Sequence, residues 1–154
     1  MLIRKGNITD TAELQNLFAN TILSVCKRDY NDDQLQVWSS GTDKKERWLQ
    51  VLEKQYVLVA VIDNVITGFC TMDKGNHIDF LFVHKDYLRQ RIANRLYSKI
   101  EQEAIRQKQT HLTADVSKTA RPFFETMGFK VIKEQIATVE GIDFINYKMK
   151  KILI

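Results

Sequence analysis

Three β-prone segments joined by very short turns constrain the fold of this chain most. Residues Tyr56–Ile62 are nearly all apolar, as expected of a central strand. Asp63-Asn64 forms a two-residue turn into Val65–Met72, and Gly75-Asn76 leads into His77–Val83. Because turns this short join neighbouring antiparallel strands, these segments predict a three-stranded antiparallel meander.

The hydrophobic pattern changes from strand to helical spacing after the meander. A polar loop covers residues 84–90, and a helix is predicted at Arg91–Gln107. Its apolar stripe is Ile92, Leu96, Ile100 and Ala104. The strand His111–Val116 follows, and a strand–helix–strand unit forms a parallel crossover. The sheet is therefore predicted to be mixed.

The N-terminal third adds one strand and several helical pieces. Leu2–Lys5 predicts a short strand, and Thr9 or Asp10 can cap the helix that follows. Two further helical pieces are expected at Asn31–Trp38 and Asp43–Leu52, separated by a Ser-Ser-Gly break.

The C-terminal part predicts a short helix at Thr119–Met127 and a hairpin of Phe129–Val139 with Ile142–Met149. The element order is then βααβββαβαββ. It predicts a single α/β domain over residues 1–154, with a mixed, mostly antiparallel β-sheet flanked by helices.

Composition and charge narrow the class of protein. A chain of 154 residues with 44% hydrophobic content fits one globular domain. Lys and Arg are interleaved with Asp and Glu despite the net charge of +4, so no nucleic-acid partner is expected. No apolar run is long enough for a membrane span, which predicts a cytoplasmic protein without a membrane partner. Cys26 and Cys70 lack metal-ligand spacing, and no metal is expected.

Two segments, in the same order, resemble the GNAT superfamily (GCN5-related N-acetyltransferases). Residues 81–97, LFVHKDYLRQRIANRLY, resemble the family junction in which a strand ending in YVHPDYQ runs into Q/R-x-x-G-x-G/A. Residues 115–129, DVSKTARPFFETMGF, resemble the family pattern N-x-x-A-x-x-F-Y-x-x-x-G-F. The resemblance implies the GNAT fold and acetyl transfer from acetyl-CoA to a primary amine of a small molecule or peptide.

The same resemblance implies where the cofactor binds. The backbone of the strand ending at Val83 would pair with the pantetheine arm, and amides of the next loop and helix would hold the pyrophosphate. The implied residues are Leu81, Phe82, Val83, Arg89, Gln90, Arg91, Ile92, Ala93, Asn94, Ser117 and Phe124. Two alternatives stay open: the basic loop is an ordinary solvated loop, and Ser117 caps the following helix.

Three positions depart from the family pattern. Leu88 stands where Gln or Arg is usual, Arg91 replaces the central glycine, and Phe124 replaces a tyrosine. A β-carbon at Arg91 obstructs phosphate approach or strains the turn, although its guanidinium suits phosphate oxygens. These departures leave open a catalytically impaired domain that binds acyl-CoA or senses a ligand.

Asp79 is the candidate general base, because a charged residue in a central strand needs an explanation. If Phe80 and Phe82 face one side of the sheet, Asp79 shares the other with Leu81 and Val83. The alternative is a partly exposed carboxylate paired with Lys or Arg. His77 and His84 rank second.

A proton donor for the leaving thiolate must come from outside the motif, since Phe124 has no hydroxyl. Tyr147 is the candidate, with Tyr87 behind it, and either is equally explained as an amphiphilic sheet or loop residue.

Four aromatic residues are candidates for the wall of the acceptor pocket, or alternatively for the core: Tyr30, Trp38, Trp48 and Phe144. The identity of the amine and the oligomeric state, a homodimer included, stay open.

Overall fold

The computed structural model describes residues 1–154 and contains one seven-stranded sheet. The strand order is β1-β2-β3-β4-β5-β7-β6, and only the β4–β5 contact is parallel. The strands are β1 Leu2–Lys5, β2 Tyr56–Ile62, β3 Val65–Asp73, β4 His77–Val83, β5 His111–Ser117, β6 Lys130–Val139 and β7 Ile142–Ile152. The predicted mixed, mostly antiparallel sheet is confirmed.

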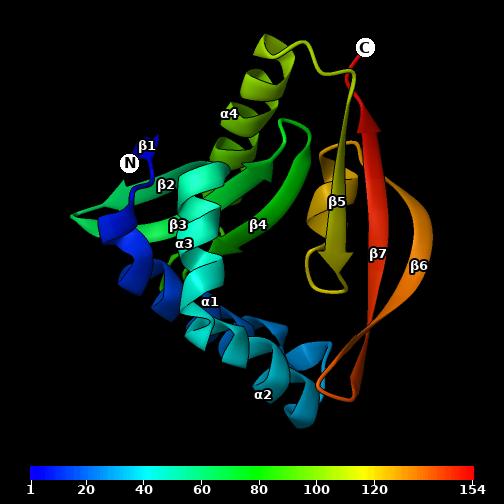
Figure 1. Ribbon diagram of the computed structural model, residues 1–154. Helices are drawn as coiled ribbons and strands as arrows, with labels where there is room; N and C mark the ends of the chain where they lie inside the picture. The colour runs from blue at the N-terminus through cyan, green and yellow to red at the C-terminus, as the bar shows by residue number, and fades with distance from the viewer.

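The helices cover both faces of this sheet (Figure 1). The α-helices are α1 Thr11–Val25, α2 Asp32–Ser39, α3 Lys45–Lys54, α4 Ile92–Arg106 and α5 Arg121–Thr126. Short 3-10 turns lie at Ile8–Asp10, Cys26–Arg28, Ser40–Asp43 and Lys85–Tyr87. The helix after Asp10 and the two further helical pieces predicted before β2 are all present as α1, α2 and α3, and the turn at Ser40–Asp43 lies at the predicted break. The chain therefore has one helix more before β2 than the predicted order βααβββαβαββ counted.

Each face of the sheet has its own hydrophobic core. The first core packs α4 and α5 on the sheet and includes Leu96, Ile100 and Phe124. The second packs α1–α3 on the opposite face and includes Leu17, Trp48 and other aromatic residues. The two faces are therefore distinguishable by the helices that cover them.

α4 packs unusually close to β3, and Gly68 permits this approach. A β-carbon at Gly68 would lie 2.9 Å from Ile92 Cγ2 and 3.1 Å from Leu96 Cδ1. A side chain there would push α4 away from the sheet. The absence of a side chain at Gly68 thus positions the N-terminal end of α4 beside the end of β4.

A β-bulge interrupts β4 at Asp79. Phe80 pairs with Thr71 of β3 and Ile78 pairs with Met72, which leaves Asp79 as an extra residue on β4. Bulges bend a strand and redirect side chains. The bend lies directly after the last residue of β4 that pairs with β5, which is Ile78.

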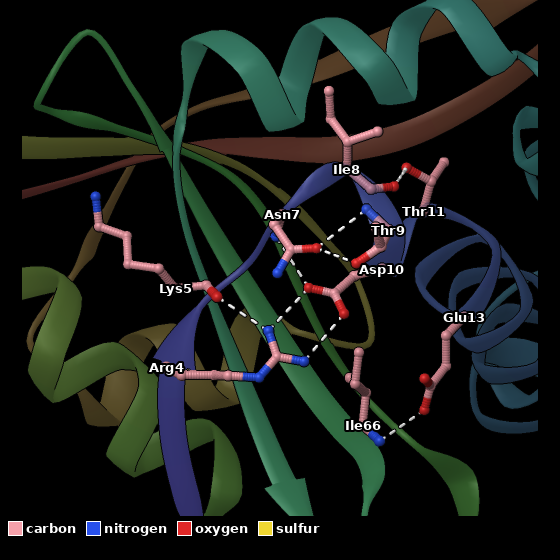
Figure 2. A network of polar contacts seen from close by, with 9 residues as sticks. All are labelled: Arg4, Lys5, Asn7, Ile8, Thr9, Asp10, Thr11, Glu13 and Ile66. Atoms are coloured by element: carbon pink, nitrogen blue, oxygen red, sulfur yellow. Dashed lines mark hydrogen bonds and ion pairs between the residues drawn. The ribbon is translucent and has the colours of Figure 1, made fainter.

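The turn from β1 into α1 is held by a polar network around Asp10 (Figure 2). Arg4 donates from Nη1 and Nη2 to the two carboxylate oxygens of Asp10, at 2.9 and 3.0 Å. The backbone amide of Asn7 donates to the same carboxylate, and the Asn7 side chain caps the 3-10 turn. Thr9 or Asp10 was expected to cap the helix. Asp10 is the N-cap residue of α1, but its side chain makes no cap hydrogen bond there; its carboxylate instead completes the capping box of the preceding 3-10 turn, whose N-cap is Asn7.

The Arg4–Asp10 pair predicts a specific acid sensitivity. The guanidinium of Arg4 lowers the pKa of Asp10 below its ordinary value. The stabilisation is therefore complete above about pH 4, where unfolded Asp titrates, and is lost as the pH falls through the lower folded pKa. We expect Asp10→Asn to lose about 1–3 kcal/mol at pH 7.

The measurement is urea unfolding between pH 2 and pH 7. The free energy of unfolding of Asp10→Asn should depend less on pH below pH 4 than that of the unsubstituted protein. Parallel pH profiles for the two proteins would show that this carboxylate does not contribute to stability.

Candidate active site

β4 and β5 separate in the middle of the sheet, and a cavity lies where they part. The two strands pair only at His77↔Thr113 and Ile78↔Ala114. The cavity has a volume of about 370 Å³ and is lined by residues 78–82 of β4 and 114–117 of β5. Side chains from α1, α2, α3, α5 and the β6–β7 hairpin complete its walls. The divergence of the two strands thus creates a cavity, lined mainly by hydrophobic residues, that is available for a ligand.

The end of β4 presents unpaired backbone groups to this opening. His84 N donates to Thr67 O of β3 at 2.8 Å, and alternate residues of an antiparallel strand bond to the same neighbour. Leu81 and Val83 therefore direct their backbone groups away from β3, toward the opening. The carbonyl of Val83 already accepts a hydrogen bond of 3.0 Å from Thr21 Oγ1 of α1. The remaining groups can bond to an extended ligand as a neighbouring strand would.

The loop between β4 and α4 has a strained backbone. Arg89 and Arg91 both have φ of 62°, in the left-handed region that residues with a β-carbon seldom adopt. Arg91 is the N-cap of α4 and makes no side-chain cap hydrogen bond. The first amides of α4 are therefore free to bind an anion. The strain expected at Arg91 is present, and Arg89 carries the same strain.

Asp79 lies on the α3 side of the sheet, together with Phe80. Arg47 Nη2 of α3 lies 3.3 Å from each carboxylate oxygen, and Gln55 Nε2 donates to Oδ2 at 2.8 Å. The expectation that Asp79 shares a face with Leu81 and Val83 is therefore wrong. Asp79 faces α3 because of the β-bulge: the extra residue interrupts the regular alternation of side chains between the two faces, which the expectation assumed.

The pairing of Asp79 with a cation, which was the alternative interpretation, is present in the structure. The ion pair is a weak one, since the Arg47 side chain is 55% exposed and the Asp79 side chain 23% exposed. Asp79 lines the cavity and also a polar groove beside α3 that reaches Lys54. The carboxylate therefore lies where a ligand entering the cavity can contact it.

The four predicted aromatic residues all line the cavity, and three of them are also buried in the core. Tyr30, Trp48 and Phe144 are 6%, 1% and 8% exposed, and Trp38 packs edge-on against Tyr30. The hydroxyl of Tyr30 donates to Ile145 O at 3.0 Å and accepts from Lys118 N at 2.9 Å. Burial raises the pKa of Tyr30, so this hydroxyl stays protonated at neutral pH.

Ser117 and Phe124 both line the cavity, whereas Tyr147 does not. Ser117 Oγ accepts a hydrogen bond of 3.1 Å from Ala120 N in the turn before α5, but the N-cap of α5 is Ala120, so the interpretation of Ser117 as the helix cap is wrong. Tyr147 packs against the core on the α4–α5 side, with the guanidinium carbon of Arg121 4.5 Å from its ring centroid. The structure thus brings Asp79 and Phe124 to one cavity and leaves Tyr147 outside its lining.

The second-ranked histidines also lie outside the cavity lining. His77 Nδ1 is 2.8 Å from Thr113 Oγ1, and His84 Nδ1 accepts from Asp86 N at 3.0 Å. No group of three or more His, Cys, Asp or Glu side chains is arranged to hold a metal ion. No helix combines the length and apolarity needed to cross a bilayer.

Sequence analysis did not identify four residues that shape this site: Thr21, Arg47, Gln55 and Asn146. Arg47 and Gln55 reach Asp79 across 32 and 24 residues of chain. No local pattern marks contacts of this kind. Asn146 could have been found only from the β5–β7 register, which places it directly opposite Ser117.

A cavity between diverging parallel strands, beside the uncapped N-terminus of α4, is the arrangement that the resemblance to the GNAT superfamily implies. A family model described as acetyltransferase (GNAT) domain matches residues 26–151. The chain therefore belongs to the GNAT family of N-acetyltransferases, and the resemblance found in the sequence is confirmed.

Individual relatives agree with this assignment. An uncharacterized N-acetyltransferase of Escherichia coli (strain K12), YafP, is 30% identical over 148 residues, which cover 96% of this chain and 93% of YafP. The GCN5-related N-acetyltransferase structure from Rhodopseudomonas palustris has a TM-score of 0.95 at 28% identity, covering 99% of this chain and 95% of that one. The PaiA N-acetyltransferase from Thermoplasma acidophilum, in complex with coenzyme A, has a TM-score of 0.79 at 19% identity, covering 98% of each chain.

The left-handed backbone at Arg91 gives a testable stability difference. Arg91→Ala keeps the β-carbon and its strain, which costs about 1–2 kcal/mol. Arg91→Gly removes the strain but loses about 0.5–1 kcal/mol to chain entropy. We expect the Gly variant to be more stable than the Ala variant by about 1 kcal/mol in urea unfolding. An Ala variant at least as stable as the Gly variant would contradict the strain.

Proposed function

We propose that this chain is an acetyl-CoA-dependent N-acetyltransferase that moves an acetyl group to a primary amine, with residues 1–154 as one catalytic domain. The main observation that supports this proposal is that β4 separates from β5 at the bulge residue Asp79. This places a carboxylate at the cavity into which the free edge of β4 opens.

The residues beside the cavity fit acetyl-CoA. The free backbone groups of Leu81 and Val83 suit the amides of an extended pantetheine arm. The uncapped amides of Ile92, Ala93 and Asn94 suit a pyrophosphate, and the loop residues Arg89, Gln90 and Arg91 are exposed beside them. The coenzyme A bound to the PaiA relative supports the same ligand class. When bound, acetyl-CoA supplies the acetyl group as a thioester.

Asp79 would make the acceptor amine nucleophilic. An ammonium ion entering the cavity can replace the guanidinium of Arg47 at this carboxylate, because a largely exposed ion pair contributes at most about 1 kcal/mol. Asp79 then takes one proton from the amine, directly or through water. The neutral amine nitrogen bonds to the carbonyl carbon, the carbon–sulfur bond breaks, and the sulfur leaves with the bonding electrons. The nitrogen then gives up its second surplus proton to water, which leaves the amide product.

The thiolate product needs a proton, and Phe124 cannot give one. Tyr147 remains the proposed donor; it lies on the α4–α5 side of the sheet, as Phe124 does. A thiol has a pKa near 8.5, so the thiolate is an acceptable leaving group and a slow proton transfer would not prevent turnover.

A second candidate function follows from the ring of Phe124, which lines the cavity where the family pattern has a tyrosine. Without an acid in this position, the domain could bind acyl-CoA as a sensor. This alternative requires saturable acetyl-CoA binding with no turnover of any amine.

Asp79→Asn tests the proposed enzyme. The amide cannot accept the proton from the amine, so we expect turnover to fall by about 100-fold or more. Acetyl-CoA affinity should stay unchanged, because Asp79 contacts the acceptor rather than the cofactor. The measurements are thiol release over a panel of amines and calorimetric titration of acetyl-CoA.

Asp115→Asn is the matched control. Asp115 lines the same cavity, but Gln135 Nε2 occupies its Oδ1 at 2.7 Å. Its substitution should change turnover by less than about tenfold, since it removes no base from the proposed reaction. Equal losses in the two variants would mean that Asp79 acts through general charge rather than as the base.

A further inference from the structure

Two side chains of opposite charge lie beside each other where α3 borders the cavity. Arg47 Nη2 is 3.3 Å from both carboxylate oxygens of Asp79, and both residues line the cavity. Their side chains are 55% and 23% exposed, so a ligand can reach either charged group. The guanidinium carbon of Arg47 also lies 5.4 Å from the centroid of the Phe80 ring, which places this pair beside an aromatic wall.

Binding of an acceptor ammonium at Asp79 leaves Arg47 without an anion. In the proposed reaction, this ammonium takes the place of the guanidinium at the carboxylate. Arg47 forms no ion pair with any other carboxylate of the protein. Lys44 also lines the cavity, and it forms no ion pair at all. An acceptor that carries its own anion therefore replaces the lost partner of Arg47.

The short distance between the two charges restricts where this anion can be on the acceptor. Arg47 and Asp79 are within hydrogen-bond distance of each other, so a ligand that pairs with both must carry its ammonium and its anion close together. In an α-amino acid a single carbon separates the two groups. The planar guanidinium also matches a carboxylate better than a point charge would. An ω-amino acid, whose charges lie at opposite ends of a chain, fits this pair poorly.

The rest of the cavity suits an apolar side chain. Five hydrophobic residues line it and keep part of their surface exposed: Val37, Trp38, Phe82, Ala137 and Val139. The rings of Trp38 and Phe82 pack edge-on, with their centroids 6.4 Å apart. Apolar surface that water can reach is stabilised when an apolar group of a ligand covers it.

Resting on the proposed function, we infer that the acceptor is an α-amino acid with an apolar side chain. Its ammonium binds Asp79, and its carboxylate binds Arg47. Its side chain lies against the partly exposed hydrophobic residues of the cavity. The nitrogen that Asp79 deprotonates is then an α-amino group.

Four small molecules test this inference by binding alone, each titrated calorimetrically into protein saturated with coenzyme A. L-2-Aminohexanoic acid represents the inferred class. n-Pentylamine lacks only its carboxylate, 6-aminohexanoic acid carries the ammonium at the far end of the chain, and L-alanine has a shorter side chain. We expect 2-aminohexanoic acid to bind at least about tenfold more tightly than each of the others, because each loses a charge-assisted hydrogen bond or apolar burial.

Arg47→Gln should reduce the advantage of 2-aminohexanoic acid over n-pentylamine to less than about threefold, because the amide cannot form the charged pair. Its affinity for n-pentylamine should be unchanged or higher, since no guanidinium then competes for Asp79. A general disruption of the cavity would instead weaken both probes. Lys45→Gln is the matched control: Lys45 is an exposed cation of α3 outside the cavity lining, and this variant should keep the full preference.

Each other outcome overturns the inference. These outcomes are no binding of 2-aminohexanoic acid, equal binding of it and any of the other three probes, a preference over n-pentylamine that survives in Arg47→Gln, or an equal loss of both probes in that variant. Failure of the unsubstituted protein to bind acetyl-CoA would instead reject the proposed function. Acetyl-CoA binding with turnover of other amines but no preference for 2-aminohexanoic acid would reject only the acceptor class.

Discussion

The separation of β4 from β5 is the constraint on which the rest of the site depends. A parallel pair continued past Ile78 and Ala114 would satisfy the edge of β4 and close the cavity. The bulge at Asp79 prevents this, since an extra residue bends the strand where pairing ends. One irregular residue thereby frees the backbone of Leu81 and Val83 and turns a carboxylate toward α3.

The N-terminal helices and the segment after α1 connect the two halves of the sheet on either side of the opening. Thr21 of α1 bonds the end of β4 through Val83 O. On the other side, Tyr30 bonds both Lys118 N after β5 and Ile145 O of β7. Figure 1 shows the tip of the β6–β7 hairpin beside α2, where Gln34 Nε2 donates to Asp143 O. The N-terminal helices therefore bridge the opening and supply one wall of the cavity.

Several features near the site are energetically unfavourable and are not needed for the fold. Two arginines in the β4–α4 loop have left-handed backbones, and the N-terminus of α4 lacks a side-chain cap. Asn146 contributes a buried oxygen without a partner. Strain and unsatisfied groups of this kind concentrate at functional sites. The two arginines lie in the loop proposed to hold a large anionic ligand, and Asn146 lines the cavity between β4 and β5.

The fold followed closely from local sequence signals, whereas the site did so only in part. His77–Val83 was predicted with the observed bounds, because two short turns fix the meander around it. The bulge at Asp79 was not predicted, since alternation of side chains assumes a regular strand. Arg47, Gln55 and Asn146 depend on contacts between distant segments, so no local pattern identified them. The strain at Arg91 was predicted because the family pattern has glycine there.

Hydrogen exchange with and without acetyl-CoA tests the central claim most directly. The amides of Leu81 and Val83 face the opening, and they should exchange slowly only when acetyl-CoA is bound, together with those of Ile92, Ala93 and Asn94. Protection at these positions in a complex of one acetyl-CoA per chain is the predicted result. Saturable binding that leaves all five amides unchanged, or no binding at millimolar acetyl-CoA, would contradict the assignment of the opening between β4 and β5 as the cofactor site.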